Sequence, residues 1–265
     1  MRADQLLVER GLAATRSQAQ RLIAAGVSWR LVGEWRRVTK NGEDLPVPAE
    51  LRLDDAAESR YVSRGGLKLE GALTALDLSV QGALCLDVGQ STGGFTDCLL
   101  HQGAQHVVGV DVGQGQLHPR LVADPRVTSL EHCNARHLVA SDLIARCDHL
   151  TRGRCGFGLE NLPFEGQFDR VVGDVSFISL TLVLPALAPL LRPQGQLLML
   201  VKPQFELQAH QLGKGGVVRD EHLYDQVEDR LRRCCADLGL TVAHWLDSPI
   251  AGGDGNREFF VHALP

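Results

Sequence analysis

Strand-like and helix-like segments alternate from residue 61 to the end of the chain, and this alternation restricts the fold more than any other feature. The expected strands are short and apolar, and they cover residues 82–89, 106–113, 126–134, 168–176, 195–203 and 257–264. The expected helices cover residues 93–104, 182–191 and 223–240. Strands separated by helices are typical of a largely parallel sheet with helices on both faces. The sequence therefore predicts an α/β fold in which ligands bind beyond the carboxyl ends of the strands.

A glycine-rich loop follows the first of these strands. The segment LDVGQSTGGFTDCLL, residues 86–100, lacks the Gly-Lys-Ser/Thr of a P-loop and the spacing of a dinucleotide-binding G-x-G-x-x-G loop. It has an acidic strand end, Asp87, before a tight turn in which small residues let a ligand approach the backbone. A second expected strand ends at Asp111, whose carboxylate could accept hydrogen bonds from ribose hydroxyls. The pattern favours a site for a nucleoside-containing cofactor over glycines that only turn the chain.

The sequence predicts a separate small domain, residues 1–58, ahead of a larger domain of residues 59–265. The polar stretch DDAAESR is the expected linker. Two helices are expected in the small domain, and the second follows a cap at Thr15 or Ser17 and stops at Gly26. The apolar stripe of this helix consists of Ala19, Leu22 and Ile23.

Charge is distributed unevenly along the chain. Residues 1–40 contain eight basic and three acidic side chains, a net charge of +5, although the whole chain carries −5. A basic segment on an acidic protein indicates a surface for a polyanion or, alternatively, a solvated helix face.

Composition argues against several classes of protein. The seven cysteines include no C-x-x-C pair and no histidines have metal-site spacing, so we expect neither a disulfide framework nor a metal. The longest apolar stretch, residues 177–191, contains two prolines and is shorter than the ~20 residues that a membrane helix needs. Because the first residues do not resemble a signal peptide, we expect a soluble cytoplasmic protein without a membrane partner.

Residues 6–28, LLVERGLAATRSQAQRLIAAGVS, resemble the small RNA-binding fold first described in a small-subunit ribosomal protein, the S-four-like module. The resemblance implies that polar and basic side chains of the module contact RNA phosphates, with salt-dependent and largely sequence-independent affinity. The residues expected to do so are Arg2, Arg16, Gln20 and Arg21. The next strand, VSWRLVG, departs from the V-x-V-N-G that relatives have at this point.

Seven segments between Tyr61 and Phe259 resemble, in order, the motifs of the TlyA or hemolysin-A-like family. They are YVSRGGLKLEGAL, CLDVGQSTGGFTDCLL, VGVDVGQGQL, DVSFISL, VKPQFE, GKGGVVRD and SPI...GN.EF. The family consists of 2′-O-methyltransferases of ribosomal RNA whose FtsJ-like catalytic domain is Rossmann-like, with a seven-stranded, mostly parallel sheet. The resemblance implies methyl transfer from S-adenosylmethionine to a ribose 2′-hydroxyl, of cytidine, in RNA within ribosomal subunits. The implied cofactor-binding residues are Asp87, Gly89, Ser91, Gly93, Gly94, Phe95, Asp111 and Asn134.

The catalytic Lys-Asp-Lys-Glu tetrad of FtsJ-like enzymes matches Lys68, Asp174, Lys202 and Glu258. A ribose 2′-hydroxyl is a poor nucleophile at neutral pH, so a neighbouring group has to orient it and accept its proton. A lysine can do this when it is partly neutral, which desolvation and a nearby cation favour. We expect Lys202 to be that group and Lys68 to assist it, while the two carboxylates fix the ammonium groups.

Two positions depart from the family pattern. Gln90 stands in the glycine loop where relatives have alanine, and it could crowd the cofactor or add a hydrogen bond. Gly173 precedes Asp174 where relatives have an apolar residue. Basic residues near the site are expected to contact RNA phosphate, and the loop of residues 213–220 to close over the RNA; these residues are Arg64, Lys214 and Arg219.

Three other functions stay open at this point. They are an RNA-binding protein that has lost methyl transfer, a membrane-active hemolysin, and a nucleotide-dependent dehydrogenase, in which the tetrad would have no role. Residues 147–166 have the composition of a surface insertion, for which we have no functional interpretation.

Overall fold

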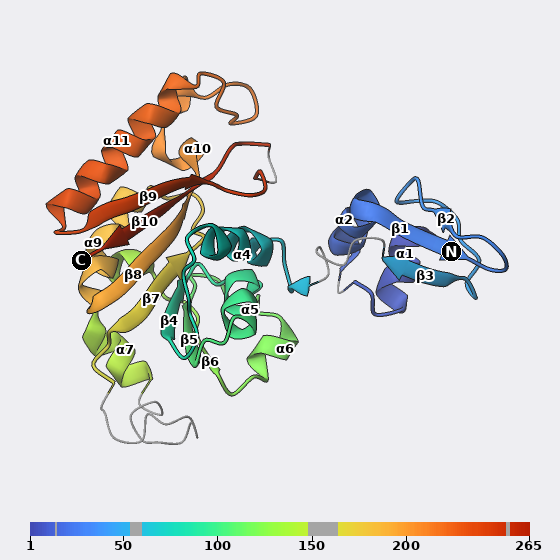
Figure 1. Ribbon diagram of the computed structural model, residues 1–265, viewed down its shortest axis with the longest axis horizontal. Helices are drawn as coiled ribbons and strands as arrows, with labels where there is room; N and C mark the ends of the chain where they lie inside the picture. Colours follow the sequence, from blue (N-terminus) through green and yellow to red (C-terminus); the bar gives the residue numbers. More distant parts are fainter. Residues whose placement is uncertain (14, 54–59, 148–163, 253–254) are drawn as a thin grey trace. The chain divides into compact units, whose positions relative to one another are not determined.

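The computed structural model describes the whole chain except residues 14, 54–59, 148–163 and 253–254 and the side chains of residues 21, 24 and 25 (Figure 1). The chain divides into two compact units, Met1–Leu67 and Lys68–Pro265. The expected domain boundary between residues 58 and 59, most of the expected linker and most of the expected insertion fall outside the described residues.

The N-terminal unit packs two helices against a three-stranded antiparallel sheet. Its elements are α1 (Ala3–Glu9), α2 (Arg16–Gly26), β1 (Val27–Arg30), β2 (Arg36–Arg37) and β3 (Glu50–Leu53), with β1 in the centre of the sheet. The Thr15 side chain accepts a hydrogen bond from the backbone N–H of Gln18, which confirms Thr15 as the N-cap of α2. The predicted stripe of Ala19, Leu22 and Ile23 is buried against α1 and the sheet.

A seven-stranded sheet forms the second unit, in the order β6-β5-β4-β7-β8-β10-β9. The strands are β4 (Leu84–Val88), β5 (His106–Val110), β6 (Val127–Leu130), β7 (Phe168–Gly173), β8 (Leu191–Val201), β9 (Thr241–Asp247) and β10 (Phe259–Leu264). The five strands from β6 to β8 are parallel, whereas β10 runs antiparallel to both of its neighbours. The mostly parallel α/β fold that the sequence predicts is confirmed.

Helices cover both faces of this sheet (Figure 1). One face carries α4 (Gly65–Ala75), α5 (Gly94–His101) and α6 (Pro119–Val122), and the other carries α7 (Ala140–Arg146), α9 (Leu184–Leu187) and α11 (His222–Asp237). Consecutive residues of β10 show the two layers, because side chains alternate along a strand. Phe259 contacts Tyr224 of α11, with ring centroids 5.4 Å apart, and Phe260 stacks on Phe95 of α5 at 6.2 Å.

Short helical elements complete the unit. They are α10 (Pro203–Glu206) and the 3₁₀ helices η1 (Ala135–His137), η2 (Leu180–Leu182), η3 (Ala188–Leu190) and η4 (Ala209–Gln211). The prediction of one continuous helix over residues 182–191 is wrong, because η2, α9 and η3 follow one another and β8 already begins at Leu191. Pro185 and Pro189 lack the backbone N–H that a continuous helix requires.

The strand register brings three segments together at one edge of the sheet. β7 ends at Gly173, which pairs with Val88 of β4 and Met199 of β8. Because β10 is antiparallel to β8, its first residue, Phe259, pairs with Val201, the last residue of β8. The residues after β7, after β8 and before β10 therefore meet at the carboxyl edge of the parallel strands.

His262 of β10 is a buried titratable group away from this edge. Its Nε2 lies 2.7 Å from Gln196 Oε1, and its Nδ1 lies 3.0 Å from Nδ1 of His244, its cross-strand partner. Burial, and then the charges of His244 and Arg170, lower the pKa of His262 to about 4. The unfolded chain therefore takes up this proton near pH 6.5 and the folded protein only near pH 4, so the stability contributed by neutral His262 is lost as the pH falls through this range.

We expect His262→Gln to flatten the pH dependence of unfolding by about 2 kcal/mol between pH 7 and pH 5, because the variant cannot take up this proton. Urea denaturation at several pH values measures the effect. His222→Gln, an exposed position at the start of α11, is the control and should behave like wild type. Equal pH dependence in wild type and His262→Gln would contradict the prediction.

Candidate active site

Two lysine–carboxylate pairs lie at the carboxyl edge of the sheet. Lys68, in the first turn of α4, pairs with Glu258 just before β10, with 2.5 Å between Nζ and Oε2. Lys202, just after β8, pairs with Asp174, just after β7, with 2.5 Å between Nζ and Oδ1. Lys202 Nζ also donates a hydrogen bond to Ser176 Oγ at 2.7 Å. The structure thus brings into this region all four residues of the expected tetrad.

The two pairs differ in their access to water. Lys68 and Glu258 are 8% and 4% exposed, whereas Lys202 and Asp174 are half-buried. Burial raises the pKa of Glu258, the neighbouring lysines Lys68 and Lys202 lower it, and Asp174 raises it. The other three groups all act on the Glu258 carboxylate, so the tetrad is one electrostatic cluster.

The glycine loop touches this cluster through its backbone. Gly89 has a φ of +80°, and a Cβ there would lie 2.6 Å from the carbonyl oxygen of Asp174. Gly93, with a φ of +96°, precedes α5, and a Cβ there would lie 2.3 Å from Cδ1 of Leu121. Gly94 is the first residue of α5. Only glycine fits these two turns, and the first of them brings the loop beside Asp174.

Acidic side chains lie at the ends of β4 and β5, as the sequence predicts. Asp87 is fully buried; its Oδ2 accepts a hydrogen bond from the Thr96 hydroxyl at 2.6 Å, and its Oδ1 has no hydrogen-bond partner among the described residues. Burial raises the pKa of Asp87 to about 7, against the hydrogen bonds from Thr96. Asp111 accepts hydrogen bonds from the backbone N–H groups of Ser91 and Gly113 at 2.8 and 2.7 Å. An unpartnered buried oxygen beside a glycine turn fits a ligand that donates a hydrogen bond.

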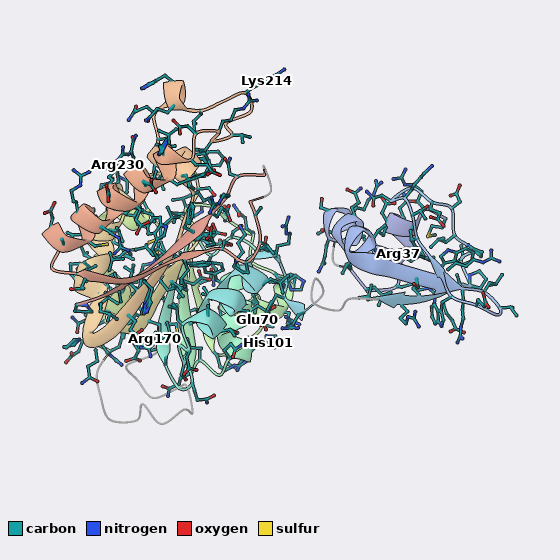
Figure 2. All side chains as sticks on the ribbon, turned by 45° about the horizontal axis from the view of Figure 1, so that its top comes forward. Arg37, Glu70, His101, Arg170, Lys214 and Arg230 are labelled. Atoms are coloured by element: carbon teal, nitrogen blue, oxygen red, sulfur yellow. The ribbon has the colours of Figure 1, made fainter. Side chains whose placement is uncertain are left out.

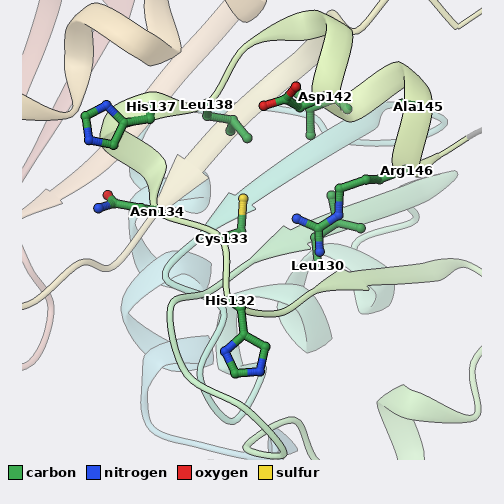
Figure 3. Close-up of a pocket in the computed structure, with 10 residues that line it drawn as sticks. Leu130, His132, Cys133, Asn134, His137, Leu138, Asp142, Ala145 and Arg146 are labelled. Atoms are coloured by element: carbon green, nitrogen blue, oxygen red, sulfur yellow. The ribbon is translucent and has the colours of Figure 1, made fainter.

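The remaining residues of the expected cofactor site have different surroundings. Ser91 Oγ donates to Gln116 Oε1 at 3.2 Å. The Phe95 ring is buried against Phe260, so an approaching ligand could contact only its backbone. Asn134 Oδ1 accepts a hydrogen bond from the backbone N–H of Arg136 and caps η1. Beside Asn134, a pocket of about 290 Å³ opens between the end of β6 and α7 (Figure 3).

Gln90 is buried inside the protein. Its side chain is 3% exposed, its Nε2 donates to Thr96 Oγ1 at 2.9 Å, and its Oε1 accepts from Ser129 Oγ at 2.7 Å. The side chain lies over β5, where a Cβ on Gly109 would be 2.0 Å from its Cδ. Of the two expected effects, Gln90 adds hydrogen bonds, but to the protein, and these bonds continue through Thr96 to Asp87.

The space beside Gly173 is filled by the side chain of Met199. A Cβ on Gly173 would lie 2.5 Å from Cε of Met199, its partner on β8. The methionine therefore occupies the space that an apolar side chain at residue 173 would fill.

Two aromatic residues at this edge are functional candidates that the sequence reasoning missed. Phe177 directly follows Ser176, has a φ of +62° and is 91% exposed. Its ring lies 5.0 Å from that of Phe205 in α10, which starts directly after Lys202. A positive φ is uncommon for a bulky side chain, and an exposed aromatic ring is a suitable surface for a flat ligand. The sequence signal that could have identified Phe177 is its position, three residues after Asp174 of the expected tetrad.

A buried asparagine holds the loop of residues 213–220. Asn256 Oδ1 accepts a hydrogen bond from the backbone N–H of Val218 at 2.9 Å, and its Nδ2 donates to the Gly216 carbonyl at 3.1 Å. Because Asn256 lies two residues before Glu258, the loop is attached beside the tetrad. Lys214 and Arg219 are exposed, and Figure 2 shows Lys214 directed away from the protein.

In the N-terminal unit, buried Asp4 gathers three of the side chains expected to contact RNA. Its carboxylate accepts hydrogen bonds from Arg2 Nε and Nη2 and Arg16 Nη2 at 3.0 Å and from Gln20 Nε2 at 3.3 Å. The hydrogen bond from Arg2 is the main reason that the pKa of Asp4 lies well below its usual range. The arginine side chains keep 45% and 55% of their surface exposed, so a phosphate can still reach them.

Arg64 and Arg21 are the other two residues near the start of the chain that the sequence predicts to contact RNA. Arg64 is half-buried and directly precedes α4. The side chain of Arg21 lies outside the described part of the structure.

Known proteins resemble this chain over nearly its whole length. Residues 61–264 match the family model described as FtsJ-like methyltransferase. The chain is 41% identical to the 16S/23S rRNA (cytidine-2′-O)-methyltransferase TlyA of Mycobacterium tuberculosis, over 98% of this chain and 88% of that protein. It is 34% identical to Hemolysin A of Brachyspira hyodysenteriae, over 100% of both chains. The solved structure of a candidate hemolysin from Streptococcus thermophilus matches with a TM-score of 0.71 and 41% identity, over 99% of this chain and 87% of that one.

The described residues contain neither a helix suited to crossing a membrane nor a cluster suited to a metal ion. Among the described residues, no helix combines the length and apolar character that crossing a membrane requires. In the same part of the chain, no three His, Cys, Asp or Glu side chains gather in a way that could hold a metal ion.

The contact between Gln90 and Gly109 yields a test of how the glycine loop is supported. Gly109→Ala should destabilise the protein by about 1–3 kcal/mol, because its Cβ would overlap the Gln90 side chain. Adding Gln90→Ala removes the overlap, so the double variant should be more stable than Gly109→Ala alone. Urea denaturation of the wild type, the two single variants and the double variant measures the coupling. Additive costs of the two substitutions would contradict this account.

Proposed function

Because the chain belongs to the FtsJ-like methyltransferase family, we propose that it transfers a methyl group from S-adenosylmethionine to a ribose 2′-hydroxyl of ribosomal RNA. The observation that carries the proposal is the meeting of the Lys202–Asp174 and Lys68–Glu258 pairs beside the glycine loop. Cytidine is the proposed nucleotide, since relatives are named for it. The proposed substrate is RNA within ribosomal subunits in the cytoplasm, with residues 1–58 as the RNA-binding module and residues 59–265 as the catalytic domain.

The surroundings of the glycine loop support a cofactor site. S-adenosylmethionine supplies a methyl group on a sulfonium sulfur, which an oxygen nucleophile can attack. Gly89 and Gly93 let a ligand approach the backbone, Asp87 offers its unpartnered Oδ1 to a donor, and Asp111 accepts from ribose hydroxyls. The other proposed contacts come from the loop and the start of α5 and from the residue beside the pocket after β6; these residues are Ser91, Gly94, Phe95 and Asn134.

In the proposed reaction, Lys202 holds the ribose 2′-hydroxyl and accepts its proton while the oxygen–methyl bond forms and the sulfur–methyl bond breaks. Asp174 and Ser176 fix Nζ of Lys202 in position. Lys68 is held by buried Glu258, and its charge stabilises the negative charge that develops on the oxygen. The scaffold adds alignment of the reacting atoms, which can lower a barrier by several kcal/mol.

The test is transfer of tritium from labelled S-adenosylmethionine to separated ribosomal subunits. Lys202→Ala should lower the rate about 10²–10⁴-fold, the usual contribution of a general base. Lys202→Arg should be similarly inactive, because arginine keeps the charge but does not release its proton, whereas Lys68→Arg should keep more activity. Calorimetry with the cofactor is the control, since both Lys202 variants should bind it like wild type. Transfer by Lys202→Arg at the wild-type rate would exclude Lys202 as the base.

Exposed Phe177 gives a second test of the substrate class. It follows Ser176, and its ring can stack on a nucleobase whose ribose reaches Lys202. Phe177→Ala should weaken use of RNA about 10-fold in kcat/KM, since stacking of one base is worth about 1–3 kcal/mol. Phe177→Trp should keep the activity, and both variants should melt like wild type because the ring is exposed. An unchanged kcat/KM in Phe177→Ala would exclude this contact.

A further inference from the structure

The outer face of the N-terminal sheet carries a cluster of arginines around one tryptophan. Strand register places Ser28, Arg30, Arg37, Glu50 and Arg52 on the same face, because Ser28 pairs with Arg37 and Arg52, and Arg30 pairs with Glu50. Trp35, in the loop between β1 and β2, completes the cluster. We refer to Arg30, Trp35, Arg37, Glu50 and Arg52 as the Trp35 surface. Arg37 is labelled in Figure 2.

This surface faces away from the core of its unit. Trp29, Leu51 and Leu53 occupy the alternate positions of the same strands and pack against the core that α1 and α2 share. Arg37 and Arg52 are exposed, and Leu31 and Val32 at the start of the β1–β2 loop are 50% and 90% exposed. The Trp35 surface is therefore distinct from the group of Arg2, Arg16 and Gln20, whose side chains converge on Asp4 of α1.

Two arginines stack on the tryptophan. The Cζ atoms of Arg30 and Arg52 lie 4.7 and 4.5 Å from the centroid of the Trp35 ring. Arg30 also donates two hydrogen bonds to Glu50, which offsets one of the three positive charges. A guanidinium that stacks through its flat face still directs N–H groups outward, and those groups pair well with phosphate. The arrangement places an aromatic ring and three guanidinium groups on one face.

Unpaired RNA is the ligand that this combination fits. Proteins that bind single strands combine aromatic or guanidinium planes, on which bases stack, with positive charge that follows the backbone. Double-stranded RNA keeps its bases stacked on one another and offers mainly phosphates. The surface includes residues of the strand and loop with the sequence VSWRLVGEWRR.

We infer that the Trp35 surface is a second RNA-binding site of the N-terminal unit, which binds an unpaired segment of the RNA substrate by stacking and by phosphate contacts. The inference rests on the proposed function, since it takes RNA as the substrate. It adds a site on the sheet face to the contacts expected from the helices.

The test measures binding of the full-length protein to fluorescein-labelled oligocytidylate and to a fully paired RNA duplex, by anisotropy at several salt concentrations. Trp35→Ala should weaken binding of the single strand about 10-fold and that of the duplex much less. Arg52→Ala and Arg30→Ala should each lower the salt dependence of single-strand binding by about one unit of slope. Trp35→Phe should bind like wild type, and so should the control Arg233→Ala, an exposed position on α11.

Wild-type binding of oligocytidylate by Trp35→Ala, in a protein that still methylates ribosomal subunits, would overturn the inference and leave the proposed function intact. Equal weakening on single strand and duplex would also overturn it, because charge alone would then explain the surface. If the wild type neither binds RNA nor methylates subunits, the proposed function fails together with the inference. A melting temperature for each variant distinguishes lost binding from lost folding.

Discussion

β10 runs antiparallel to β8, so Phe259, its first residue, lies beside Val201, the last residue of β8. In a fully parallel sheet the last strand would bring its carboxyl end to this edge. The reversal instead places Glu258 among residues that follow parallel strands, next to the segment that begins with Lys202. The glycine loop reaches the same place because Gly89 has no side chain to collide with the Asp174 carbonyl. One reversed strand and one missing Cβ are thus what allow four distant segments of the chain to form a single site.

Buried carboxylates organise cations in both units. Glu258 forms an ion pair with Lys68, and both side chains are buried. Asp4 is also buried and forms ion pairs with Arg2 and Arg16, whose side chains stay about half exposed. An isolated buried charge costs several kcal/mol, so each carboxylate is stable only with its partners, and removing one partner leaves the other uncompensated. The same arrangement fixes the direction of long, flexible side chains. If these side chains bind the proposed RNA substrate, their positions are already set, which lowers the entropy that binding has to overcome.

The sequence predicted those features that depend on neighbouring residues in the chain, namely strands and helix ends. The alternation of apolar segments identified six strands of the large sheet. Of the two expected caps of α2, Thr15 was correct, and so was the stop at Gly26. The seventh strand, β9, is an edge strand whose sequence, TVAHWLD, contains four apolar residues, but these do not alternate with the polar ones, so the strand pattern is missing. The prolines in residues 182–191 were visible, but their effect on the helix was underestimated. Nothing near Gln90 in the sequence shows that it turns toward β5, because that depends on a glycine in another strand.

The fit of Gln90 over Gly109 also has a consequence for how such chains diverge. Gly109, across the sheet on β5, makes room for the long Gln90 side chain. Replacing only one of these residues changes the fit: a Cβ at position 109 overlaps the Gln90 side chain, and a short residue at position 90 leaves a void. A change at one position therefore favours a matching change at the other. Gly173 and Met199 form a second such pair, so these positions are expected to change together across an alignment of homologues.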